Sequence, residues 1–116
     1  MKIGILGVGA IGGVIGGYLA KGNHDVTLID TWPANIDRIK SSGLKISAIE
    51  GEFTTTTPAL HMGELSAYGQ SFDAIILSVK SYDTEWAATF AKPYLAPGGF
   101  IISAQNSINE EVIASV

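Results

Sequence analysis

A glycine pattern near the N-terminus constrains the fold more than any other feature of the sequence. Gly7, Gly9 and Gly12 are spaced as G-x-G-x-x-G in a chain that holds 14 glycines. The apolar run at 2–6 before them predicts a buried strand, and the run at 10–21 after them predicts a helix. The pattern is weak alone, but it gains weight because it stands between a strand and a helix.

Each glycine has a separate physical role in such a turn. Gly7 permits the tight turn out of the strand, Gly9 lets the backbone approach a pyrophosphate, and Gly12 lets the helix pack close to the strand. The free N–H groups at the helix N-terminus favour a bound anion. The sequence therefore predicts a dinucleotide-binding turn; the alternative is a tight turn without a ligand. The candidate contacts are Gly7, Val8, Gly9, Ala10, Ile11 and Gly12.

The second strand, expected at 26–29, is followed by an acidic residue, Asp30. A carboxylate at this place accepts hydrogen bonds from the adenosine ribose hydroxyls and repels a 2′-phosphate. Thr31 follows, where a basic residue would favour NADP. The local chemistry therefore favours NAD(H). The alternative role for Asp30 is a cap on the helix expected from Pro33 to about Ser41.

The rest of the chain continues to alternate strands and helices. The further expected elements are a hairpin of strands at 44–49 and 52–57, strands at 73–79 and 100–103, helices at 83–95 and 109–115, and a turn at 97–99. Residues 58–70 are expected to be irregular, with a helical turn near Glu64 and with His61 in a surface loop.

An aromatic stripe marks the expected helix at 83–95. Trp86, Phe90 and Tyr94 recur at every fourth residue and would share one face. Large aromatic side chains at this spacing are typical of a buried face. We therefore expect these three rings to pack in the core.

Apolar strands that alternate with helices predict a parallel sheet covered on both faces. We expect an α/β fold of the Rossmann type, doubly wound and mainly parallel, and incomplete at the C-terminus because the chain stops inside an expected helix. Its 116 residues suit one domain, 1–116, and are too few for a typical two-domain dehydrogenase.

Composition and charge argue against several classes of function. The chain has no cysteine, and only His24 and His61 could supply imidazole, so we expect no metal site. A net charge of −4 without a basic cluster argues against nucleic acid as a partner. The apolar stretch at 3–20 is interrupted by glycines, so we expect no membrane span, and no secretory signal opens the chain. A cytoplasmic location is the default expectation.

Two more strand ends are expected at the edge of the sheet that carries the glycine turn and Asp30. Ligands collect beyond the carboxyl ends of parallel strands. Lys80 is a candidate contact for cofactor phosphate or adenosine, and its alternative is a solvated loop lysine. Asn106 is a candidate hydrogen-bond partner of the nicotinamide ribose or the substrate, and its alternative is a turn or a helix cap.

Three segments together resemble the N-terminal domain of the ketopantoate reductases (2-dehydropantoate 2-reductases). They are residues 1–12, the segment SVKSYDT at 78–84 and the segment QNSINEE at 105–111. The likeness spans the whole chain in order, and the last two segments are more specific than the glycine turn. The resemblance implies NADPH-dependent reduction of 2-dehydropantoate to pantoate, in the pathway to pantothenate and coenzyme A.

The resemblance also implies roles for residues. Gly7 to Gly12, Lys80 and Asn106 would contact the cofactor, whereas the family's catalytic lysine and substrate-binding residues belong to a helical C-terminal domain that is absent here. No catalytic residue is therefore expected in this chain. Two positions depart from the family: Asp30-Thr31 stands where a basic residue is usual, and Ser107 replaces a common glycine. The cofactor is thus NAD(P)H, with Asp30 favouring NAD(H) and the family favouring NADP(H).

Two functions remain in competition. The leading hypothesis is the cofactor-binding domain of an NAD(P)H-dependent 2-oxoacid reductase, inactive as a fragment and acting with a small 2-oxoacid substrate; a homodimer is left open. The alternative is a nucleotide-sensing module of the potassium-channel regulatory type, without catalysis. The hairpin and the Lys80 and Asn106 segments argue against the alternative.

Overall fold

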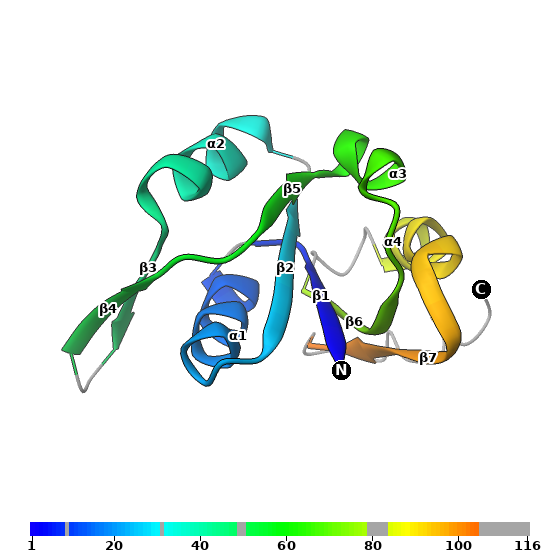
Figure 1. The fold of residues 1–116 in the computed structure, drawn as a ribbon, viewed down its shortest axis with the longest axis horizontal. Coiled ribbons are helices and arrows are strands. Elements are labelled where there is room, and N and C mark those ends of the chain that lie inside the picture. The colour runs from blue at the N-terminus through cyan, green and yellow to red at the C-terminus, as the bar shows by residue number, and fades with distance from the viewer. Residues whose placement is uncertain (9, 31, 49–50, 79–83, 105–116) are drawn as a thin grey trace.

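The computed structural model describes residues 1–8, 10–30, 32–48, 51–78 and 84–104. Five strands in these residues form one parallel sheet, in the order β5-β2-β1-β6-β7 (Figure 1). The strands are β1 (Lys2–Leu6), β2 (Asp25–Asp30), β5 (Ala59–His61), β6 (Phe72–Leu77) and β7 (Leu95–Ser103). The chain starts in the middle of the sheet, fills one side and then the other, which is the doubly wound arrangement that the sequence predicts.

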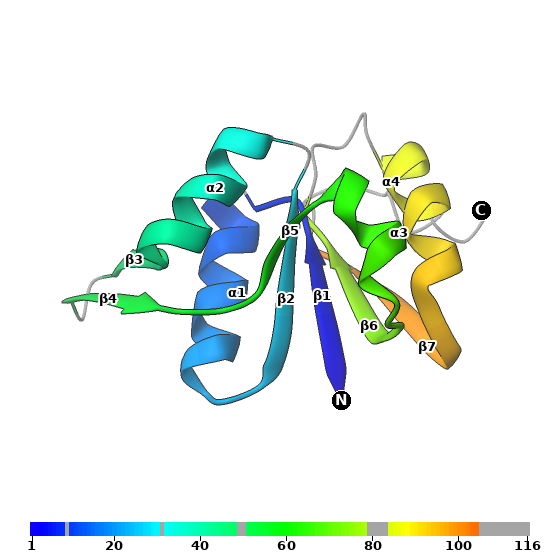
Figure 2. The ribbon, with the colours of Figure 1, turned by 45° about the horizontal axis from the view of Figure 1, so that its top comes forward.

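Helices and a hairpin cover the two faces of this sheet. One face carries α1 (Ala10–Lys21), α2 (Pro33–Ser42) and the antiparallel hairpin of β3 (Leu44–Ala48) and β4 (Gly51–Thr55). The other face carries α3 (Leu65–Tyr68) and α4 (Thr84–Ala91) (Figure 2). The short 3-10 helices η1 (Met62–Glu64) and η3 (Lys92–Tyr94) complete the described elements. None of the described helices has the length and apolar character needed to cross a bilayer.

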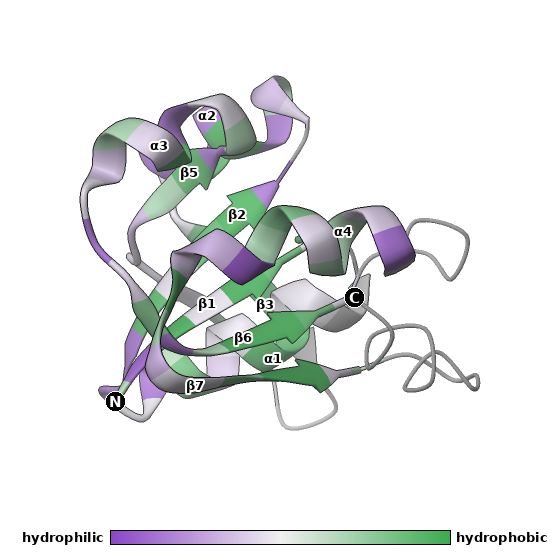
Figure 3. Cartoon of the chain, turned by 90° about the vertical axis from the view of Figure 1, so that its right-hand side faces the viewer, coloured by the Kyte–Doolittle hydropathy of each residue, from purple (hydrophilic) through white to green (hydrophobic). Residues whose placement is uncertain are grey.

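Each face of the sheet buries its own hydrophobic core. Ile5 and Leu28 belong to the core under α1 and α2, whereas Leu6 and Ile75 belong to the core under α3 and α4. Successive side chains of a strand point to opposite faces, which is why neighbours such as Ile5 and Leu6 enter different cores. Burial of one such side chain contributes about 1.5–3 kcal/mol. The strands accordingly hold much of the strongly hydrophobic sequence (Figure 3).

Helix α1 lies unusually close to its neighbours. A Cβ added at Gly16 would come within 2.7 Å of Leu28 Cδ2 in the sheet. A Cβ added at Gly17 would come within 2.8 Å of Ile46 Cδ1 in the hairpin. The hairpin is therefore packed against the outer side of α1, where the Phe53 ring meets Tyr18 edge-on with centroids 5.1 Å apart.

The prediction of an irregular segment at 58–70 is wrong at residues 59–61, whereas the helical turn expected near Glu64 is confirmed by η1 (Met62–Glu64). Residues 59–61 form β5, which pairs in parallel with the end of β2, and η1 and α3 follow it. His61 is not in a loop: it ends β5, and its Nδ1 accepts a hydrogen bond from the Gly63 N–H at 3.2 Å. A strand of three residues shows no readable alternation, because its formation depends on pairing with β2 rather than on local sequence.

The aromatic stripe on α4 does not form the core face. Trp86 is 49% exposed, whereas Phe90 and Tyr94 (the latter in η3) are partly buried and pack against the edge of the core. The buried face is instead made of the small side chains Ala87, Ala88 and Ala91. Alanines let the helix axis approach the sheet closely, so the larger rings are displaced to the flank.

The C-terminal part of the expected helix at 83–95 also differs. The α-helix stops at Ala91 and a 3-10 turn follows, because Pro93 has no N–H to continue the helical hydrogen bonds. The turn expected at 97–99 lies inside β7 as an irregularity: Phe72 pairs with Leu95, but Ala74 pairs with Phe100. The helix expected at 109–115 lies outside the described residues.

Candidate functional site

The carboxyl ends of the central strands are level with one another. Leu6 of β1 pairs with Ile29 of β2 and with Leu77 of β6, and Leu77 pairs with Ser103 of β7. The residues that come next at this edge are Gly7, Asp30, Ser78 and Ala104. The structure thus brings together the ends of the first two strands, where the sequence predicts the glycine turn and Asp30. Gly9, Lys80 and Asn106 lie outside the described residues.

The turn after β1 begins at Gly7, whose φ of +98° is rarely adopted by residues with a side chain. The Gly7 N–H donates to the Ile29 carbonyl oxygen at 2.9 Å. The Gly7 carbonyl oxygen accepts a hydrogen bond from Ser78 Oγ. The turn is therefore fixed by β2 on one side and by β6 on the other.

Gly12 closes the glycine pattern from within α1. A Cβ at this position would overlap the Gly7 carbonyl oxygen and Ser78 Oγ, so the first turn of the helix rests directly on the end of β1. Val8 buries its side chain in the core. The close contact between the helix and the end of the strand is the one that the glycine pattern predicts for Gly12.

Asp30 ends β2 beside this turn and is partly exposed. It is not the cap of α2: Trp32 occupies the N-cap position without a side-chain cap, and its indole is 65% exposed. Asp30 Oδ2 instead accepts a hydrogen bond from Asn35 Nδ2 at 3.0 Å. The carboxylate is therefore placed at the edge of the sheet by a side chain of α2.

Sequence reasoning missed three polar residues at this edge. Ser78 holds the Gly7 carbonyl, Asn35 contacts Asp30, and Arg38 Nη2 donates to Asn35 Oδ1 at 2.5 Å. Only the place of Asn35 and Arg38 in the first turns of α2, close behind Asp30, could have drawn attention to them. The residues that the structure describes hold no group of three or more His, Asp or Glu side chains that could bind a metal ion.

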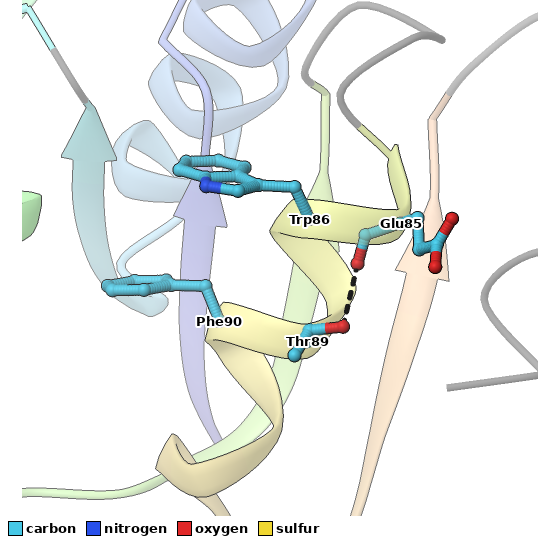
Figure 4. A pocket seen from close by; sticks show the side chains of 4 residues that line it. All are labelled: Glu85, Trp86, Thr89 and Phe90. Atoms are coloured by element: carbon cyan, nitrogen blue, oxygen red, sulfur yellow. Dashed lines mark hydrogen bonds between the residues drawn. The ribbon is translucent and has the colours of Figure 1, made fainter.

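An open pocket lies on α4 (Figure 4). Glu85, Trp86, Thr89 and Phe90 line this open pocket of about 510 Å³. The Trp86 and Phe90 rings are stacked with centroids 6.0 Å apart, while Glu85 points to the other side of the helix. All four residues belong to one helix, whereas the strand-end site is formed by the ends of several strands.

The doubly wound parallel sheet, the glycine turn after its first strand and the acid at the end of its second define a Rossmann-type α/β domain. The family model for ketopantoate reductase PanE/ApbA matches residues 3–115. The chain therefore belongs to the ketopantoate reductase PanE/ApbA family.

Individual relatives agree with this assignment. The chain is 38% identical to the 2-dehydropantoate 2-reductase of Pyrococcus abyssi, over 96% of its own length and 35% of that protein. It is 40% identical to the enzyme of the same name from Pyrococcus horikoshii, over 97% of its length and 36% of that protein.

Solved structures give the same picture. A PanE/ApbA family ketopantoate reductase from Ralstonia eutropha JMP134 is similar with a TM-score of 0.88 and 33% identity, over 100% of this chain and 38% of that one. D-mandelate dehydrogenase, in a ternary structure with NADH and anilino(oxo)acetate, is similar with a TM-score of 0.88 and 28% identity. The match covers 99% of this chain and 37% of that one. The chain spans little more than a third of the length of these relatives.

Proposed function

We propose that residues 1–116 form the dinucleotide-binding domain of an NAD(P)H-dependent 2-oxoacid reductase, and that the intact protein is a 2-dehydropantoate 2-reductase. The observation that carries this proposal is the position of Gly7, hydrogen-bonded to Ile29 and Ser78, level with Asp30 at the carboxyl edge of the sheet. Membership of the ketopantoate reductase family and the names of the relatives support the choice of reaction.

The residues present fit a dinucleotide. The turn at 7–12 and the N-terminus of α1 would hold the pyrophosphate, because Gly12 lets the first turn of the helix rest directly on Gly7 and Ser78 at the end of β1. Asp30 would accept hydrogen bonds from the adenosine ribose. We further propose that Lys80 contacts phosphate or adenosine and that Asn106 contacts the nicotinamide ribose or the substrate.

The chemistry that the cofactor supplies when bound is a hydride for the carbonyl carbon of the 2-oxoacid. The residues of this chain bind and orient the dinucleotide, and we assign no catalytic residue among them. The group that protonates the oxygen of the reduced carbonyl is proposed to lie in the rest of the intact protein.

The test is a turnover assay with the intact protein. We expect oxidation of NADH or NADPH that depends on 2-dehydropantoate. Phenylglyoxylate, the 2-oxoacid that corresponds to mandelate, is the comparison substrate, because D-mandelate dehydrogenase has the same fold at a TM-score of 0.88. Turnover with phenylglyoxylate alone would overturn the proposed substrate. An absence of turnover with both substrates would overturn the proposal that the intact protein is a 2-oxoacid reductase.

The nucleotide-sensing module is not favoured as the function. The family match runs through residues 3–115 and leaves almost no part of the chain for another architecture. We therefore retain the reductase as the single proposed function.

A further inference from the structure

Asn35 is a buried polar side chain that the proposed function does not use. It lies in the first turn of α2 and is only 7% exposed. A buried amide costs free energy unless its hydrogen-bonding groups find partners. Its partners are therefore informative about why an amide is present here at all.

The amide of Asn35 joins three segments of the chain. Its Nδ2 donates to the Val8 carbonyl oxygen at 3.1 Å and to Asp30 Oδ2 at 3.0 Å. Its Oδ1 accepts from Arg38 Nη2 at 2.5 Å. One side chain thus links the glycine turn, the end of β2 and the exposed face of α2.

These partners fix the orientation of the amide. The Val8 carbonyl and the Asp30 carboxylate only accept hydrogen bonds, whereas the Arg38 guanidinium only donates them. An amide flipped by 180° would lose all three bonds. Because the amide cannot flip, the Asp30 oxygen that it binds is held in one position.

We propose that Asn35 is a positioning residue that makes the site prefer NADH over NADPH. This inference rests on the proposed function, since it concerns the same dinucleotide site. With Asp30 held in place, its carboxylate offers a fixed acceptor to a ribose 2′-hydroxyl and a fixed negative charge to a 2′-phosphate. Loss of Asn35 removes one hydrogen bond that orients the carboxylate, which weakens both the acceptor for the 2′-hydroxyl and the repulsion of a 2′-phosphate.

The two bonds from Nδ2 have separable effects. The bond to Val8 acts on the turn that faces the pyrophosphate, and that part is the same in NADH and NADPH. Its loss therefore weakens both nucleotides equally. The bond to Asp30 acts on the ribose, where the two nucleotides differ. The ratio of the two dissociation constants consequently reports on the Asp30 bond alone.

The experiment measures dissociation constants of NADH and NADPH for the intact protein by calorimetry. We expect wild type to bind NADH more tightly, and Asn35→Ala to reduce this preference about tenfold, as expected for one hydrogen bond to a charged group. In an Asp30→Asn background the same Asn35→Ala substitution should leave the ratio unchanged, because the charge it positions is gone. Asn35→Ser serves as the second variant should the alanine variant fail to fold.

The outcomes separate the two proposals. If the wild-type protein binds neither nucleotide, the proposed function fails. If it binds them and Asn35→Ala weakens both equally, or if the ratio shifts equally with and without the Asp30 charge, then Asn35 is structural only and the inference is overturned.

Discussion

Gly12 lies where helix α1 passes closest to the end of β1. The alanine methyl in Gly12→Ala would overlap the Gly7 carbonyl oxygen, which is backbone, and Ser78 Oγ. We expect Gly12→Ala to lower the free energy of unfolding by about 1–3 kcal/mol and to weaken nucleotide binding, because the helix must move away from the turn. Denaturant unfolding monitored by circular dichroism gives the first quantity.

Gly13→Ala is the matched control in the same helix. The nearest atom to its added methyl is Leu44 Cδ1 at 3.9 Å, an ordinary contact. Alanine favours a helix over glycine by up to about 1 kcal/mol, so this variant should be as stable as wild type or more stable. Equal unfolding midpoints for Gly12→Ala and Gly13→Ala would show that the tight contact at Gly12 does not exist.

Residues that form a local pattern could be predicted, and residues that act across the fold could not. The spacing of Gly7 and Gly12 and the position of Asp30 are visible in short stretches of sequence. Asn35 reaches the Val8 carbonyl across 27 residues, and Ser78 reaches Gly7 across 71 residues. No local pattern encodes such pairs, because the parallel sheet creates them. The roles of Lys80 and Asn106 stay predictions.

Helix α4 presents small residues to the sheet and large ones to its flank. Trp86→Ala should therefore lower the free energy of unfolding by less than about 1 kcal/mol, since Trp86 is half exposed and its ring stacks on the partly buried Phe90. Ala88→Leu should cost about 1–3 kcal/mol, since Ala88 is fully buried and a larger side chain must displace the helix. The measurement is thermal unfolding of both variants by circular dichroism. A larger loss of stability for Trp86→Ala than for Ala88→Leu would instead indicate that the aromatic face is the buried one, as the spacing suggested.

The elements that sequence predicts best are those with long apolar runs. Strands β1, β2 and β6 and helix α1 come within a few residues of their expected bounds, because their burial on both sides leaves an apolar signal. Strand β5 is too short for such a signal. The face of α4 was assigned wrongly because aromatic spacing shows that side chains share a face and does not show that this face is the buried one.

An ion pair joins the two sides of the molecule around the β5 edge. Lys40 of α2, on one face of the sheet, lies 3.0 Å from the Glu64 carboxylate of η1, which leads to α3 on the other face. Glu64 also accepts a hydrogen bond from the His61 N–H at 2.9 Å. The His61 hydrogen bond, with that from Lys40, holds the pKa of Glu64 below its ordinary value of 4.5.

A lowered pKa makes a prediction for acid stability. The contribution of the Glu64 carboxylate is fully present above pH 4.5, the unfolded value, and is lost as the pH falls through the lower pKa of the folded state. Glu64→Gln should thus be less stable than wild type near neutral pH, and the difference in melting temperature should shrink as the pH falls below 4.5. The effect should be small, because the pair is on the surface. A difference that stays constant over this range would contradict the prediction.

Both tryptophans of the chain, Trp32 at the start of α2 and Trp86 on α4, have exposed rings. Their placement decides what optical spectroscopy can report. Indoles already in contact with water change their emission little when the chain unfolds, so intrinsic fluorescence would be a poor probe of folding here. Trp32 lies two residues from Asp30, beside the proposed ribose site, and a reduced nicotinamide absorbs light in the range where indole emits. Quenching of Trp32 emission would therefore follow occupancy of the site, with a Trp32→Phe variant as the optical blank.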